Sequence, residues 1–517
     1  METSRIHKSL LNARVSLVFY LLTLLLSFFS RSIFLHYLGA DFLGLTGTVS
    51  NLLGFLNLAE MGVGAAIGFM LYKPLFERNH QQIAEIVSLM GGLCRRIGYV
   101  VLAAGILLSA FLPLFFSKEA IPLGVIFTAY YAFLISSLIG YFINYREILL
   151  MADQRNYVVT AYFQTAGIAK VLLQMAIAFY FGSLYAWIVV ELLFSVLLSL
   201  ILNWKINKVY PWLHTDPKKG TQLFRQYPQA GEKIRQLFIH KISDFTLYST
   251  RDMFIYAFTS LSMVAYYGNY MVIIWKLNQL MLTALGSIQA GIGNLVAENH
   301  LPKTIRVFWE IVALRYFSSA VFVFSVYHLI EPFIVLWIGT GYLLKKRVLF
   351  LILCNIFLMQ VRGPAINFLQ AYGLFADTMA PVTEALMNIT ISIGLGYRYG
   401  IEGVLLGSIA SMLLIGCIWK PIYLFRKGFS QPVWNYWKET IKYLVLIGLS
   451  WWLGSYLLYL LQLPDPATSL SRWIFYAMAL VTAYSLLLGT FFYTLKGSRD
   501  LIQRVILYFN KRGLWKE

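Results

Sequence analysis

Long apolar segments alternate with short polar ones along almost the whole chain. Apolar runs of about 20 residues recur from Val15 onwards, and a helix of that length crosses a hydrocarbon core of about 30 Å. Charged residues, glycines or prolines separate the runs. This pattern predicts an all-α polytopic membrane protein. We expect about fourteen transmembrane helices, over residues 15–38, 43–71, 97–117, 122–149, 157–181, 183–204, 238–260, 264–295, 308–330, 347–373, 379–398, 403–425, 440–463 and 471–495.

The composition agrees with a membrane protein. Of the 517 residues, 59% are hydrophobic and only 13% are charged, whereas a soluble domain needs more polar surface. The net charge of +19 would suggest a nucleic-acid partner in a soluble protein, but basic loops between membrane spans have a simpler cause, so we expect no nucleic acid. Cys94, Cys354 and Cys417 are far apart. They indicate neither a metal site nor a disulfide framework, and we expect no cofactor.

The distribution of basic residues predicts the orientation. Most of the Lys and Arg residues fall in the N-terminal tail, the C-terminal tail and alternate loops. Few fall in the remaining loops, namely Lys118, Lys345, Lys346, Arg347, Arg398 and Arg472. Basic loops stay in the cytoplasm, so both termini are expected there. The first apolar run is too long for a signal-peptide core and should remain as a helix.

The longest hydrophilic stretch, 205–237, contains Pro211, Pro217, Gly220 and Pro228, as a surface linker does. We therefore predict an N-terminal six-helix bundle at 1–204, a cytoplasmic linker at 205–237, a C-terminal six-helix bundle at 238–427, and two additional helices with a basic tail at 428–517.

The two halves show a weak duplication at an offset near 220 residues. Arg31–Phe34 aligns with Arg251–Phe254, and the run from Asn144 falls opposite the run from Pro364. Six helices per half make the repeats parallel. Transporters of this kind place the substrate site at the interface of their repeats.

Several ionisable side chains lie inside the predicted spans, where each costs about 2.5 to 3.5 kcal/mol and must face the bundle interior or a wet cavity. The basic ones outnumber the acidic ones. Phosphate or carboxylate ligands need Arg or Lys, whereas cationic drugs need carboxylates, so an anionic substrate is favoured. The residues in question are Arg31, Lys170, Arg251, Lys276, Arg362 and Lys420, with Glu60, Glu191, Asp252 and Glu384.

Arg31 and Arg251 are the foremost candidates, because the duplication puts them at equivalent depths on the first helix of each half. Both could converge on one anionic ligand. The structural alternative is that Arg251 pairs with a carboxylate such as Asp252 and that Arg31 extends toward the membrane surface. Lys276 and Arg362 are further candidates for the same cavity, with charge neutralisation as the alternative.

Glu60 lies mid-span among small residues that permit close helix approach. It could bind a coupling proton or cation, or pair with Arg31. Asp252, Glu191 and Glu384 carry the same two interpretations. Gly363 and Pro364 follow Arg362 directly and predict a kink there.

The chain contains no phosphate-binding loop of the GxxxxGK[ST] type, no HExxH and no GxSxG motif. Transport driven by ATP on this chain alone and common hydrolase chemistry therefore lose support, and we expect no enzyme activity. A membrane glycosyltransferase or polymerase remains an alternative of a different class, although every predicted external loop is short.

Two runs carry a family resemblance. SRSIFLHYLGADFLGL at Ser30–Leu45, followed by NLAEMGVGAAIGFMLYKPL at Asn57–Leu75, resembles the opening of the Wzx-type polysaccharide exporters. These belong to the multidrug/oligosaccharidyl-lipid/polysaccharide (MOP) superfamily. The resemblance is specific in the first two helices and extends to the rest of the chain only as the fourteen-helix plan.

The resemblance implies two six-helix bundles around a cationic cavity in a bacterial cytoplasmic (inner) membrane. It implies a flippase for an undecaprenyl-diphosphate-linked oligosaccharide of O-antigen, capsule or exopolysaccharide assembly, working beside the polymerase and glycosyltransferases of that pathway, with membrane lipids around it and H⁺ or Na⁺ as coupling ions. In such families basic residues on helices 1 and 7 or 8 contact the diphosphate, and Arg31, Arg251 and Lys276 match by position. A multidrug cation antiporter and a peptidoglycan-precursor flippase stay open as alternatives.

Overall fold

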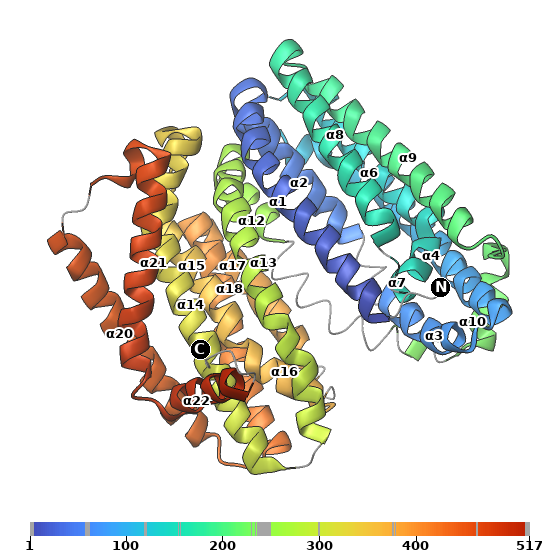
Figure 1. The fold of residues 1–517 in the computed structure, drawn as a ribbon. Helices are drawn as coiled ribbons and strands as arrows, with labels where there is room; N and C mark the ends of the chain where they lie inside the picture. Colours follow the sequence, from blue (N-terminus) through green and yellow to red (C-terminus); the bar gives the residue numbers. More distant parts are fainter. Residues whose placement is uncertain are drawn as a thin grey trace. The chain divides into compact units, whose positions relative to one another are not determined.

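The computed structural model describes residues 5–56, 63–117, 121–153, 155, 157–228, 230–232, 234, 250–297, 300–374, 377, 379–461 and 464–511. Within these ranges every regular element is a helix (Figure 1). The contacts divide the chain into two compact units, Met1–Asn269 and Tyr270–Glu517.

The described residues of unit 1 form eleven α-helices and the start of a twelfth, which continues into unit 2. Their bounds are α1 Arg5–Leu38, α2 Ala40–Leu56, α3 Val63–Glu77, α4 His80–Ser109, α5 Leu112–Phe115, α6 Leu123–Phe142, α7 Glu147–Ala152, α8 Tyr157–Phe181, α9 Leu184–Val209, α10 Gly220–Gln226, α12 Arg251–Phe258 and α13 Leu261–Ala297, of which α10 and α12 are short and α13 crosses the boundary. Helix α8 packs on α1 and α9, while α6 packs on α4 and α9.

Unit 2 contains the rest of α13 and the helices that follow. They are α14 Leu301–Ile338, α15 Lys346–Val361, α16 Gly363–Ala371, α17 Met379–Tyr399, α18 Ile401–Ser411, α19 Lys420–Tyr423, α20 Trp434–Leu461, α21 Leu470–Phe492 and α22 Lys496–Lys511. Two π-helical turns, Met412–Trp419 and Leu424–Gly428, flank α19. In Figure 1, α20 and α21 form an outer pair against α14, as their contacts require.

The described residues contain nine helices long and apolar enough to span a membrane, or ten if one bent pair is counted as a span. The bent pair is α1 and α2, and the bend between the two helix axes is 116°. Gly39 joins them with φ +87°, a conformation that glycine adopts without strain. The predicted ranges 43–71 and 238–260 extend into residues outside the described part. The chain is a multi-pass membrane protein, and the all-helical architecture expected from its apolar pattern is confirmed.

The predicted kink after Arg362 coincides with a break between α15 and α16. Pro364 lies in the first turn of α16, where its missing N–H removes no helical hydrogen bond. Unit 1 has a break at the aligned place, where α6 ends at Phe142 and a 3₁₀ turn, Asn144–Arg146, precedes α7. The break recurs in both halves at the predicted offset.

The hydrophilic stretch after α9 packs against unit 1 wherever it is described. Gly220, at the start of α10, lies against Gly92 of α4, and an added Cβ on either would stand 2.5 Å from the other Cα. Asp216 N–H donates to Ser88 Oγ at 2.9 Å, and Tyr227 Oη donates to Glu85 Oε2 at 2.8 Å. This segment forms a folded cover on α4. The contact division falls later than this segment, inside α13, and the predicted domain bounds remain a proposal.

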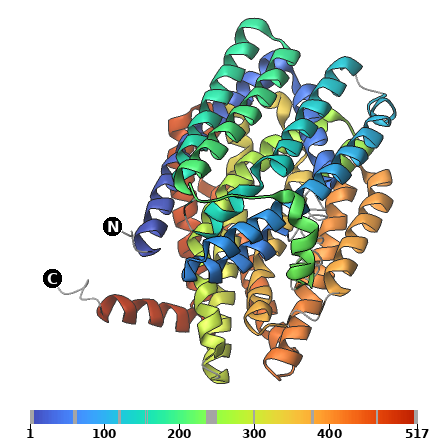
Figure 2. The same ribbon diagram turned by 90° about the vertical axis from the view of Figure 1, so that its right-hand side faces the viewer.

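The final helix, α22, lies crosswise to the upright helices of its unit and projects sideways from them, as Figure 2 shows. It packs on α14. Arg504 Nη2 lies 2.9 Å from the buried Glu310 Oε1 of α14, and this ion pair attaches the helix to the bundle.

Candidate anion-binding cluster

Arg31 and Arg251 both lie in unit 1, on helices with matching ends. Arg31 stands seven positions before Leu38, the last residue of α1, and Arg251 stands seven positions before Phe258, the last residue of α12. Another helix begins shortly after each end, at Ala40 for α2 and at Leu261 for α13. The local structure therefore repeats at the offset of 220 that the sequence alignment predicts.

Neutral groups hold Arg31. Its Nε donates to Asn269 Oδ1 at 2.7 Å, and its Nη2 donates to the carbonyl of Ala265 at 3.0 Å, both on α13. Gly268 makes this approach possible, because a Cβ there would stand 2.8 Å from Arg31 Nη2. Among the described residues no carboxylate lies within ion-pair distance of Arg31. Arg31 points across to α13.

Arg251 is buried, with 6% of its surface exposed. Its Nη1 donates to the hydroxyl of Tyr267 at 3.0 Å, again on α13. The next residue, Asp252, accepts a hydrogen bond from Asn51 Nδ2 of α2 at 2.8 Å. Asp252 interacts electrostatically with both Arg251 and Arg31. We call Arg31, Arg251, Asp252, Tyr267 and Asn269 the arginine cluster.

Within the arginine cluster as defined here, two guanidinium groups accompany one carboxylate, that of Asp252. Asn269 is fully buried, and its Nδ2 has no hydrogen-bond partner within the described part of the chain. An unused buried N–H is a donor, as the guanidinium nitrogens are. The chemistry of the cluster therefore suits an acceptor-rich, negatively charged group such as a phosphate.

The remaining predicted site residues lie elsewhere. Lys276 is on the unit 2 part of α13, half-buried. Glu60 lies outside the described residues. Lys420, at the start of α19, lies 3.3 Å from Asp377. Of the predicted residues that the structure describes, Arg31, Arg251 and Asp252 lie together in one cluster.

Two other predicted pairs are ion pairs within one unit. Arg362 Nη1 lies 2.6 Å from Glu384 Oε1, and both side chains are 7% exposed. Lys170 Nζ lies 2.7 Å from Glu191 Oε1, whose other oxygen accepts from Gln174 at 3.0 Å. Each basic group here already has a carboxylate beside it. This geometry fits the charge-pairing interpretation of Glu191 and Glu384.

The structure adds one buried cation that the sequence interpretation did not single out. Arg315 lies on α14, inside the predicted span 308–330, with 8% of its surface exposed. A lone arginine in an apolar run was the signal that could have identified it.

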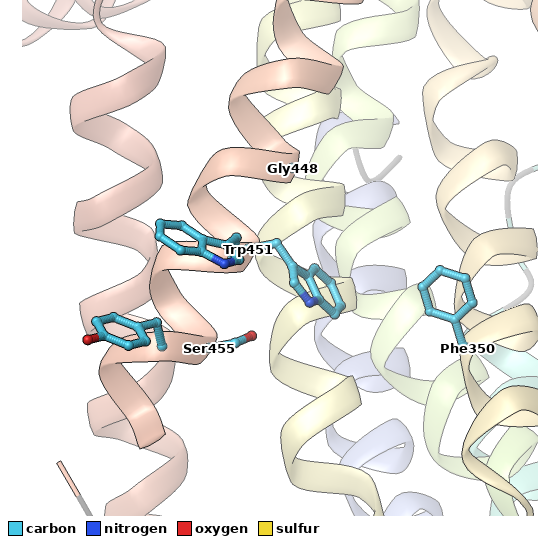
Figure 3. Close-up of a pocket in the computed structure, with 6 residues that line it drawn as sticks. Phe350, Gly448, Trp451 and Ser455 are labelled. Carbon is cyan, nitrogen blue, oxygen red and sulfur yellow. The ribbon is translucent and has the colours of Figure 1, made fainter. Parts of the chain in front are cut away.

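A groove of about 550 Å³ on unit 2 contains none of these charged residues. Figure 3 shows its aromatic lining, with Phe350 of α15 facing Trp451 of α20. Gly448 and Ser455 complete the labelled wall. The lining is apolar and uncharged, so this groove does not suit an anionic group.

Comparison with solved structures identifies the fold. The chain is similar to the lipid II flippase MurJ in an inward closed conformation, with a TM-score of 0.66 at 14% identity over 94% of this chain and 99% of that one. It is also similar to an inward-facing multidrug resistance MATE family transporter of the MOP superfamily, with a TM-score of 0.59 at 14% identity over 80% of this chain and 99% of that one. The chain has the fold of MOP flippases and transporters. No family model matches the sequence, and no curated protein matches it.

Proposed function

We propose that this protein is a flippase that moves an undecaprenyl-diphosphate-linked oligosaccharide from the inner to the outer leaflet, as the Wzx-type exporters do. The arginine cluster is the observation that carries the proposal. Arg31 is held by neutral acceptors, and among the described residues no carboxylate lies within ion-pair distance of it. A diphosphate would supply a negative charge for this guanidinium.

The mechanism uses α12 and the start of α13, which we call the hairpin. Polar contacts attach the hairpin to α1 and α2. Ser262 Oγ donates to Asp41 Oδ1, Asn51 donates to Asp252, and Arg31 donates to Asn269. With the proposed orientation, the Gly39 end of these helices faces outward. The hairpin must separate from α1 and α2 for the head group to leave on that side.

The bound anion would loosen those same contacts. A charge-assisted hydrogen bond is about twice as strong as a neutral one, so a phosphate oxygen competes well with the Asn269 amide and the Ala265 carbonyl for Arg31. Substrate binding then releases the hairpin from α1. The polyprenyl tail stays in the lipid while the head group crosses.

The membrane potential favours this direction. Moving a negative charge outward across an inside-negative membrane is favourable by about 2.3 kcal/mol per 100 mV. Antiport of H⁺ or Na⁺ through an acidic residue could add to this driving force, and Glu60 and Asp252 are the candidates in the first half. A multidrug cation antiporter is disfavoured, because its ligand would meet two arginines.

The test is translocation by single-site variants. Arg31→Ala and Arg251→Ala should each abolish surface polysaccharide while leaving folding and membrane insertion intact. Arg31→Lys should restore part of the activity, because the charge remains but the planar fork is lost. Lys170→Ala, at an ion pair elsewhere in unit 1, is the matched control and should retain transport. Normal polysaccharide levels in both arginine variants would refute the proposal.

A peptidoglycan-precursor flippase is the second candidate. The fold likeness to a lipid II flippase covers 94% of the chain. The same anionic chemistry would apply. Complementation of cells depleted of their own lipid II flippase separates the two candidates, since a dedicated oligosaccharide flippase should fail to support growth there.

A further inference from the structure

Arg315 is buried in α14 of unit 2, well inside the predicted apolar range. It lies seven residues beyond the start of the range 308–330, about 10 Å along the helix axis. A long basic side chain near a helix end can extend to the membrane surface. Arg315 does not do so, because only 8% of its surface is exposed. Its charge therefore has to be satisfied inside the unit.

The groups that meet Arg315 are neutral. Arg315 Nη1 donates to Gln360 Oε1 of α15 at 2.7 Å, and Gln360 Nε2 donates in turn to Asn278 Oδ1 of α13. Gln360 is 2% exposed and Asn278 is fully buried. Among the described residues, no carboxylate lies within ion-pair distance of Arg315.

In this chain of hydrogen bonds each side chain donates to the next, and the last one, Asn278, still has an N–H to donate. Asn278 Nδ2 is buried and has no partner in the described ranges, nor has the hydroxyl of Ser319, one turn after Arg315. Two helices, α13 and α14, thus present an arginine, an amide N–H and a hydroxyl with no carboxylate among the described residues within ion-pair distance of the arginine. The nearby arginine Arg362 differs, because Glu384 lies 2.6 Å from it.

Gly363, at the break between α15 and α16, lies beside the guanidinium of Arg315. A Cβ built on it would lie 4.0 Å from Arg315 Nε and touch nothing closer. A methyl group at this position would therefore fit without displacing Arg315.

We propose that unit 2 contains an oxyanion site of its own, in which Arg315 binds a phosphate-class group and Asn278 donates a second hydrogen bond. Gln360 positions the guanidinium. The site belongs to unit 2 alone and does not depend on the proposed transport function. The anion could be the phosphate of a polyprenyl lipid or free inorganic phosphate, which share the chemistry that the site recognises.

The experiment measures binding to the full-length protein in nanodiscs. One arm titrates sodium phosphate against sodium chloride at constant ionic strength. The other incorporates a polyprenyl phosphate, with the corresponding polyprenol as its uncharged control. Arg315→Gln should weaken binding at least tenfold, and Arg315→Lys should have an intermediate effect. Arg306→Gln, an exposed position on the same helix, should bind as the natural chain does.

The two arms identify the source of the anion. Arg315-dependent binding of sodium phosphate indicates free phosphate, and Arg315-dependent binding of the polyprenyl phosphate alone indicates a lipid head group. If Arg315→Gln unfolds, Asn278→Leu tests the site with the charge retained and should weaken binding several-fold. Binding that disappears in Arg31→Gln but is unchanged in both the Arg315→Lys and Asn278→Leu variants overturns the proposal. Absence of binding in both arms overturns it as well.

Discussion

Arg31 in unit 1 and Arg362 in unit 2 lie on helices of similar apolar character, yet they are satisfied in different ways. Arg362 has a carboxylate 2.6 Å away, and both members of that pair are almost fully buried. Arg31 has an asparagine side chain and a backbone carbonyl instead. A compensated charge contributes to packing, whereas a charge met by neutral groups can still bind an anion. The group that the arginine contacts therefore distinguishes a structural arginine, which has a carboxylate partner, from a candidate binding group, which has neutral partners.

The largest expected effect is on stability, at the compensated pair. Arg362→Met leaves Glu384 buried without the cation beside it, and breaking such a pair costs about 3 to 5 kcal/mol. The double variant Arg362→Met/Glu384→Met should regain most of that loss, because no charge remains buried. Unfolding in denaturant measures both. A double variant that is stable yet fails to transport would place this pair in the substrate path and remove the contrast with Arg31.

The next effect is on function, at the neutral partners of Arg31. Gly268→Ala places a methyl group 2.8 Å from the present position of Arg31 Nη2, which is too close for two atoms not bonded to each other. The guanidinium must move, and a displacement of about 1 Å can cost up to about 10²-fold in activity. We expect transport to fall at least tenfold, with little change in thermal stability.

Gly140→Ala on α6 is the matched control for that variant, because no atom lies within 4 Å of its added Cβ. Equal transport by the two alanine variants would show that the placement of Arg31 is unimportant.

The smallest effect concerns the hairpin contact between Ser262 and Asp41. Ser262→Ala removes one hydrogen bond worth about 1 kcal/mol, or about fivefold in an equilibrium. Backbone hydrogen exchange over residues 259–264 should accelerate by that factor if the hairpin separates from α2. Ser136→Ala, whose hydroxyl donates only within its own helix, is the control. Unchanged exchange in Ser262→Ala would argue against this contact as a hairpin attachment.

The sequence could predict the part of the site that depends on the repeat, namely the equivalent positions of Arg31 and Arg251. The alignment of Arg31 with Arg251 depends on sequence alone, and both residues stand at equivalent places before a helix end. The ligand role of the pair stays a prediction. The partners could not be predicted, because Asn269 and Tyr267 are ordinary polar residues on a long apolar helix. Their importance depends on which face of α13 meets α1 and α12.

Arg315 and Arg362 show the same limit within unit 2. Both are arginines in apolar runs, and neither run indicates which polar partner its arginine meets. Glu384 is 22 residues from Arg362, and Gln360 is 45 residues from Arg315. Only the packing of α14, α15 and α17 decides that one arginine has a carboxylate and the other a glutamine.

The sequence by itself determined that this chain is a multi-pass helical membrane protein, because the length of each apolar run is set by the hydrocarbon thickness and needs no knowledge of the other helices. It also identified charged residues inside the apolar runs. Only the tertiary structure decided which of those charges have a carboxylate beside them, where the segment after α9 packs, and that α12 and the start of α13 belong to unit 1. Those outcomes depend on contacts between helices distant in sequence, and an apolar helix carries no local signal of its neighbour.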